Sequence, residues 1–239
     1  MQTDRMFYLP LAPEFFAILV LAFIITAVAI QFRLLRYAYM QLGVSSRAAV
    51  LLLLASLIGS YVNIPVAEIP SHASTASQQV VEFFGMRYYL PVAGGAPTTI
   101  IAVNVGGAVI PIIMSLYLLA HYHLWFKGAI ATAVLAALCY YLASPVPGVG
   151  IAVPIFVPAI ASAIVAFVLD RGYVAPLAYI AGSLGTLIGA DLMNLDKIAG
   201  LGAPVASVGG AGTFDGIFLT SIIAVLLSSL APRETAKPA

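Results

Sequence analysis

The sequence predicts an all-α fold, a polytopic bundle of transmembrane helices with about seven spans, built as a single integral-membrane domain from residues 1–239. Two observations predict it. Hydrophobic residues make up 62% of the chain and charged residues 8%, whereas a soluble domain is about 25% charged. The apolar residues also gather into runs of about 20, the length that crosses a bilayer as a helix. We therefore expect an integral membrane protein whose main partner is the lipid bilayer.

Seven apolar runs define the expected spans, and short connections after the third, fourth and fifth favour antiparallel neighbours in one bundle. The sequence shows no soluble domain between them and no clear internal repeat. The runs are residues 14–33, 47–66, 98–120, 125–143, 151–169, 174–194 and 212–230.

The distribution of Lys and Arg predicts the orientation, because cytoplasmic loops carry an excess of both. If the first connection is cytoplasmic, that side holds Arg33, Arg36, Arg47, Lys127, Arg171, Arg233 and Lys237. The other side holds only Arg5, Arg87 and Lys197. We expect an outside N-terminus and a cytoplasmic C-terminus.

Two outer connections differ from ordinary loops. Residues 67–97 mix Ser, Gln and Pro with aromatic side chains, which predicts a short helix or hairpin on the outer interface. Residues 194–210 are too apolar for a solvated loop and too rich in Gly and Pro for a span. They predict a partly re-entrant segment packed against protein.

Small residues recur at helical spacing along the sixth run, at Ala178, Gly182, Gly185 and Gly189. Small residues let helix backbones approach closely in membranes. This stripe predicts a seam for helix packing.

Two carboxylates form the leading candidate site. Asp191 lies about one turn before the outer end of the sixth run, and Asp215 about one turn inside the outer end of the seventh. Consecutive antiparallel helices would place both about 5 Å below one interface. Two close carboxylates in a low dielectric share a proton, as in an aspartic protease that activates water. Asp191 and Asp215 are therefore the predicted catalytic residues.

The stretches "GADL" and "GAGTFD" around these acids resemble the intramembrane aspartyl proteases of the GxGD type. Presenilin, signal peptide peptidase and prepilin peptidase belong to that group. The resemblance implies that Asp191 and Asp215 are catalytic and that Gly210 and Gly212 are the glycines of the second motif. Small residues there also leave room for a membrane-anchored peptide substrate, and no cofactor is predicted. In this chain Thr213 and Phe214 separate Gly212 from the acid.

Over its whole length the chain resembles an uncharacterised prokaryotic family of multi-spanning membrane proteins, through "SLIGSYVNIPV", "GADLMNL" and "GGAGTFDGIFL". The resemblance implies a multi-span fold in a prokaryotic cytoplasmic membrane and leaves the function open.

A transporter or channel for a small solute or ion is the alternative. Asn63, Asn104 and Asn194 join the two acids in supplying oxygen atoms in the outer half of the bundle. Interrupted helices with carboxylates and amides form ion sites in transporters, and Na⁺ or Ca²⁺ prefers such oxygens. The amides would equally serve as structural hydrogen-bonding groups between helices.

A non-catalytic membrane subunit, whose acids only tie helix ends together, is the third hypothesis. No metal site is predicted, and a net charge of +1 without a basic run gives no reason to expect nucleic acid. The oligomeric state is not predicted.

Overall fold

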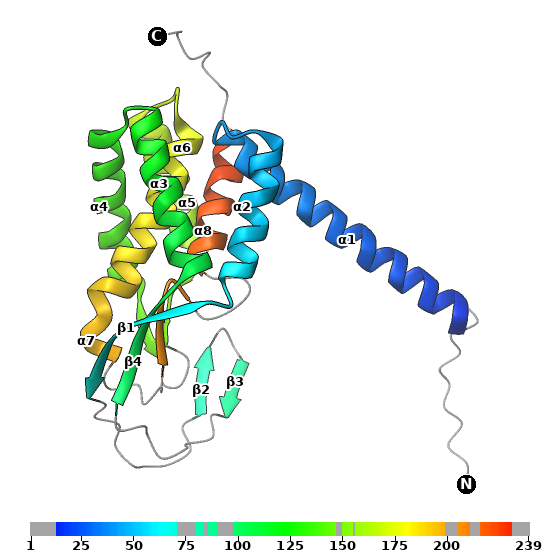
Figure 1. Ribbon diagram of the computed structural model, residues 1–239, viewed down its shortest axis with the longest axis horizontal. Helices are drawn as coiled ribbons and strands as arrows, with labels where there is room; N and C mark the ends of the chain where they lie inside the picture. The colour runs from blue at the N-terminus through cyan, green and yellow to red at the C-terminus, as the bar shows by residue number, and fades with distance from the viewer. Residues whose placement is uncertain are drawn as a thin grey trace.

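The computed structural model describes residues 13–70, 80–83, 86–89, 98–146, 150–154, 156–198, 205–210 and 216–230. Most of them form a bundle of helices, and a small sheet closes one end of it (Figure 1). We call the end that carries β1 and β4 the sheet end. The opposite end, where turns join α1 to α2, α3 to α4 and α5 to α6, is the loop end.

The helices of the bundle follow the predicted runs, but several are shorter. They are α1 (Pro13–Gln41), α2 (Ser46–Gly59), α3 (Ile110–His121), α4 (Trp125–Leu142), α5 (Phe156–Leu169), α6 (Val174–Ile180) and α8 (Gly216–Ser228). A short π-helix, η1 (Val105–Val109), precedes α3. Helix α6 continues through η2 (Ala181–Gly185), η3 (Leu187–Asp191), η4 (Leu192–Asn194) and α7 (Leu195–Ile198).

Among the described residues, three helices are long and apolar enough to cross a membrane: Phe16–Gln41, Trp125–Leu142 and Val174–Lys197. Four more apolar helices are shorter, so each predicted run contains an apolar helix although not each is a full span. Helix α2, for example, has 14 residues, about 21 Å by the helical rise, against about 30 Å of bilayer hydrocarbon. The orientation relative to the cytoplasm stays a prediction.

The all-α prediction is wrong at the sheet end. There β1 (Asn63–Pro70), β4 (Thr98–Asn104) and β7 (Val205–Val208) form a sheet in the order β1-β4-β7. Strand β4 pairs antiparallel with β1 and parallel with β7. Two hairpins accompany it: β2 (Val80–Phe83) with β3 (Met86–Tyr89), and β5 (Ser144–Val146) with β6 (Gly150–Ala152). The first lies within residues 67–97, for which the sequence predicts a short helix or a hairpin, and β7 lies within the predicted re-entrant segment 194–210.

Local chemistry explains why the second and third runs end as strands. Pro65 has no N–H and its ring clashes with a preceding helical turn, so α2 stops at Gly59 instead of reaching residue 66. The start of the third run, "TTIIAVN", is rich in β-branched residues that favour a strand. Pro65 and Pro70 lie in β1, an edge strand, where a missing donor is tolerated.

The glycine stripe is a packing seam, as predicted. A Cβ on Gly182 would lie 3.0 Å from the Ser221 Cα atom of α8, and one on Gly189 only 2.1 Å from the Ala136 oxygen of α4. Only glycine permits this approach of backbones, so the helix 174–197 is held between α4 and α8.

The loop end is held by polar contacts. Lys127 Nζ lies 2.6 Å from Asp170 Oδ2, and the Tyr122 hydroxyl donates to the Leu42 carbonyl at 3.0 Å. Helix α1 packs here by its last turns, with Ala38 and Tyr39 buried, while the rest extends away from the bundle (Figure 1).

Candidate functional site

Four predicted site residues lie where irregular segments meet at the sheet end. Asn63 begins β1, and Asn104 ends β4 as its partner across the ladder. Val208 ends β7 beside Val103, and the turn at Gly209 and Gly210 follows. This arrangement brings Asn63, Asn104 and Gly210 into one hydrogen-bonded network, and Asp191 contacts the same turn.

Asn104 is 1% exposed, and both the nitrogen and the oxygen of its side-chain amide form hydrogen bonds within the protein. Its Nδ2 atom donates to the Ser60 carbonyl at 2.8 Å and to Asn63 Oδ1 at 3.1 Å. Its Oδ1 atom accepts from the Gly107 N–H at 2.8 Å and so caps η1. Asn104 therefore ties the end of α2 to the start of η1, the structural role that amides play between helices.

Three oxygens gather beside Asn104: Asn63 Oδ1, Ser207 Oγ and the Gly210 carbonyl oxygen. We call them the oxygen cluster. Ser207 Oγ lies 2.6 Å from Asn63 Oδ1 and 2.7 Å from the Gly210 oxygen. A hydroxyl carries one proton and can donate to only one of them.

Exchanging the Oδ1 and Nδ2 positions of the Asn63 amide does not supply the proton that the second contact lacks. Its NH₂ group would then face that of Asn104, now 3.1 Å from Asn63 Oδ1, and the Gly107 N–H fixes the orientation of Asn104. One short oxygen–oxygen contact in the cluster thus lacks a bridging proton. Asn63 is exposed, and Ser207 and Gly210 are half-buried, so the cluster is accessible.

Asp191 contacts the turn next to the cluster. Its Oδ2 atom accepts from the Gly209 N–H at 2.7 Å, and Gly209 has a φ of +89° that favours glycine. A Cβ on Gly209 would lie 2.6 Å from the Ala108 Cβ atom. The turn is therefore fixed between η1 and η3, and Asp191 holds it from the η3 side.

Asn194 lies apart from the cluster and is fully buried. Its Nδ2 atom donates to the carbonyls of Gly189 and Ala190 at 2.9 Å each, and its Oδ1 atom accepts from Lys197 at 2.6 Å. It satisfies carbonyls of the irregular helix immediately before Asp191. These bonds give Asn194 a structural role, and its predicted substrate contact stays a prediction.

Gly212 and Asp215 lie outside the described residues, so the separation of the two carboxylates stays a prediction. Sequence analysis missed Ser207 and Gly209. The signal available for them was a serine in the apolar stretch "VASV", followed directly by two glycines. Small polar residues before such a turn indicate a site where side-chain oxygens meet backbone.

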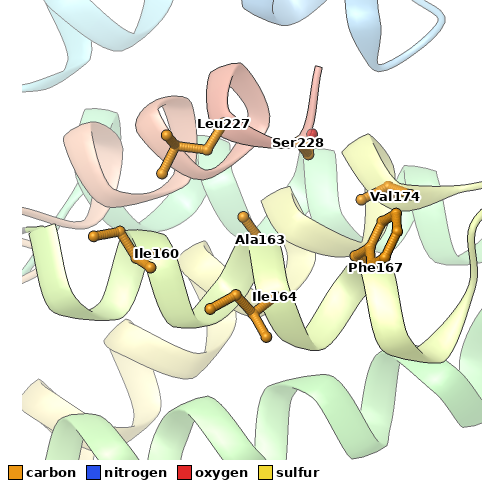
Figure 2. A pocket seen from close by; sticks show the side chains of 7 residues that line it. All are labelled: Ile160, Ala163, Ile164, Phe167, Val174, Leu227 and Ser228. Carbon is orange, nitrogen blue, oxygen red and sulfur yellow. The ribbon is translucent and has the colours of Figure 1, made fainter. Parts of the chain in front are cut away.

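A groove elsewhere on the bundle has no chemistry of this kind. It measures about 280 Å³, and its lining is apolar except for Ser228 (Figure 2). Residues of α5, α6 and α8 form it, with Ile160, Ile164 and Phe167 on α5. Within the described part of the chain, moreover, no three His, Cys, Asp or Glu residues come together as metal ligands.

Comparison with known proteins identifies a family. A family model described as "Protein of unknown function (DUF1614)" matches residues 57–227. The match includes the sheet, Asp191 and the oxygen cluster, and it leaves α1 outside. No curated protein and no solved structure matches the chain.

Proposed function

The chain belongs to the DUF1614 family, and we propose that this member moves a small hard cation, Na⁺ in the first instance, across a membrane through a site at the oxygen cluster. The observation that carries the proposal is the short oxygen–oxygen contact without a proton at Ser207. Oxygens of amides, hydroxyls and carbonyls are the ligands that hard cations prefer.

The backbone around the cluster supports the proposal. Helix α2 gives way to a strand beside it, and strand β4 gives way to a π-helix. Transporters build ion sites at such interruptions, where unwound carbonyls face the ion. The Gly210 carbonyl is a group of this kind, because it belongs to a turn and already faces Ser207.

The charges also favour a cation. The C-terminal end of α2 is the negative end of its dipole, and the N-terminal end of η1 is positive, so these contributions oppose each other. Asp191, which binds the N–H of Gly209 next to the cluster, supplies the local charge. An ionised Asp191 would attract a cation to the turn.

Uptake of ²²Na⁺ into proteoliposomes tests the proposal. We expect the wild-type protein to take up the ion down an imposed Na⁺ gradient, and the Ser207→Ala and Asp191→Asn variants to lose most of this uptake. Asp170→Asn is the matched control, because it removes a carboxylate at the loop end. Wild-type uptake no faster than that of protein-free vesicles would contradict the proposal.

A second candidate, an intramembrane aspartyl protease, is favoured by the contact between Asp191 and Gly209. Gly209 precedes Asp215 by six residues in the sequence. The protease hypothesis predicts that Asp191→Asn and Asp215→Asn each abolish processing of a membrane-anchored peptide at normal folded yield. Ser207→Ala should leave processing intact, which distinguishes this candidate from cation transport.

The non-catalytic subunit stays the third hypothesis. It predicts that Asp191→Asn lowers stability, because the Gly209 N–H loses a charged acceptor, while neither uptake nor processing depends on the protein at all.

A further inference from the structure

Three buried hydroxyls without hydrogen bonds lie in the bundle, away from the oxygen cluster. They belong to Tyr39 of α1, Ser56 of α2 and Tyr179 of α6. Their residues are 0%, 5% and 1% exposed, yet none of the three hydroxyls has a hydrogen-bond partner within the described residues. A buried hydroxyl left unpaired is costly, so three together need an explanation.

The three hydroxyls are neighbours. The rings of Tyr39 and Tyr179 face each other with centroids 6.2 Å apart and a tilt of 54°. The Tyr39 hydroxyl also lies near those of Ser56 and Tyr179, although neither pair has the geometry of a hydrogen bond. Three side chains from three helices therefore direct polar atoms into one buried region.

From this arrangement we infer that the three hydroxyls hold one buried water molecule, which joins α1 to α2 and α6. Buried waters typically make about three hydrogen bonds to polar groups that would otherwise be unsatisfied. Each hydroxyl both donates and accepts, so one water satisfies all three by accepting from two and donating to the third.

The surroundings favour a neutral ligand over an ion. The buried polar residues of the described chain are Ser, Thr and Asn, without a buried Lys, Arg, Asp or Glu. An ion among Tyr39, Ser56 and Tyr179 would lack a countercharge in a region of low dielectric, where desolvating a charge is expensive. Water carries no such cost.

The site has a structural consequence for α1. Tyr39 and Ser56 precede residues 57–227, the part matched by the family model, whereas Tyr179 lies within it. The water therefore joins the N-terminal helix to the family's bundle. Because α1 extends away from the bundle elsewhere (Figure 1), the contacts of its last turns determine how firmly it is held.

Thermal unfolding of the full chain in detergent tests the inference, with reaction of the single cysteine, Cys139, as the readout. Cys139 is buried and reacts only when the bundle opens. Removing a hydroxyl that is hydrogen-bonded to the water should destabilise the protein, whereas removing a hydroxyl without a hydrogen bond should stabilise it. We expect Tyr39→Phe and Tyr179→Phe each to lower the midpoint by roughly 2–4 °C.

The double variant sharpens the test. If both tyrosines bind the same water, Tyr39→Phe/Tyr179→Phe should lower the midpoint by less than the sum of the two single changes. Tyr117→Phe is the matched control, since Tyr117 is exposed on α3, and it should leave the midpoint unchanged. A midpoint that rises or stays constant in both single variants overturns the inference.

If the tyrosine variants do not fold, two other measurements decide. They are the unfolding midpoint of the Ser56→Ala variant and an experimental density map of the wild-type protein. The inference expects Ser56→Ala to lower the midpoint, and a density peak within about 2.7–3.2 Å of at least two of the hydroxyls. A map that shows other buried waters but none here overturns it.

Discussion

Asn104 is the residue on which the sheet end depends most. One buried amide joins the carbonyl of Ser60 just after α2, the first residue of β1 and the first turn of η1. Its role is therefore to hold Asn63 in place, so that Asn63 Oδ1 faces Ser207. The cation site that we propose is formed by Asn63, Ser207 and Gly210, with Asn104 as its support.

Asn104→Ala should destabilise the protein by on the order of 2–4 kcal/mol, because it removes an N-cap and leaves the buried Gly107 N–H and Ser60 carbonyl without partners. Detergent unfolding followed by Cys139 reactivity measures the change. Asn63→Ala is the comparison, since Asn63 is exposed and only one of the Asn104 bonds ends on it. Equal stability of the Asn104→Ala variant and the wild type would contradict the assigned role.

Asp170 makes stability depend on pH at the loop end. Partial burial raises the pKa of its carboxyl, but the hydrogen bond from Lys127, the Gly172 N–H and the charge of Lys127 outweigh burial and lower the pKa below its usual 3.8. A lowered pKa adds stability that is present above the unfolded value and disappears as the pH falls through the folded value.

Asp170→Asn should therefore flatten the loss of stability on acidification below about pH 4. The effect should stay within about 1 kcal/mol, because Lys127 is exposed and such pairs are weak. Unfolding midpoints at several pH values, compared between wild type and variant, measure it. Identical acid slopes would show that the pair adds nothing.

At the scale of elements, the close contact between helix 174–197 and α4 depends on one glycine. Gly189→Ala would place a Cβ 2.1 Å from the Ala136 oxygen and 2.7 Å from its Cα. Both atoms are backbone, so the helices must separate, at a cost of about 1–3 kcal/mol or more.

Gly216→Ala is the matched control for that prediction. Gly216 begins α8, and a Cβ there meets nothing within 4 Å. It should leave the unfolding free energy unchanged or slightly raised. If the two variants unfold alike, the packing seam is not as close as the structure has it.

The element scale also shows where sequence reasoning succeeds. The seven apolar helices were predictable because a long run of apolar residues is visible in the composition of the sequence. The glycine stripe was predictable from its helical spacing. The strands β1 and β4 were not distinguished from helix, since Ile, Val and Ala are apolar in either conformation. Pro65 and the run Thr98–Ile101 carried the signal for strands, but length alone favoured a span.

The sequence predicted which residues belong to the candidate site, but it did not predict which residues they contact. Asn63, Asn104 and Asp191 stood out as polar groups in apolar surroundings. Their connection through Ser207 and Gly209 depends on the parallel pairing of β7 with β4, a contact between segments about 100 residues apart. No local pattern encodes such a contact.

For the whole molecule, the excess of Lys and Arg predicts that the loop end is cytoplasmic. Single cysteines in a Cys139→Ala background test this: Glu68→Cys lies at the sheet end and Gly172→Cys at the loop end. In intact cells an impermeant maleimide should label Glu68→Cys at once, and Gly172→Cys only after permeabilisation. The reverse pattern would invert the topology.

Binding of Na⁺ to the purified protein tests the central claim most directly. A cation that binds only the folded state raises the unfolding midpoint, by about 2.7 kcal/mol of stability when its concentration is 100 times its Kd. At constant ionic strength, replacing choline by Na⁺ should raise the midpoint of the wild type and leave that of Ser207→Ala unchanged. Equal midpoints for the wild type in Na⁺ and choline would contradict a cation site at Asn63, Ser207 and Gly210.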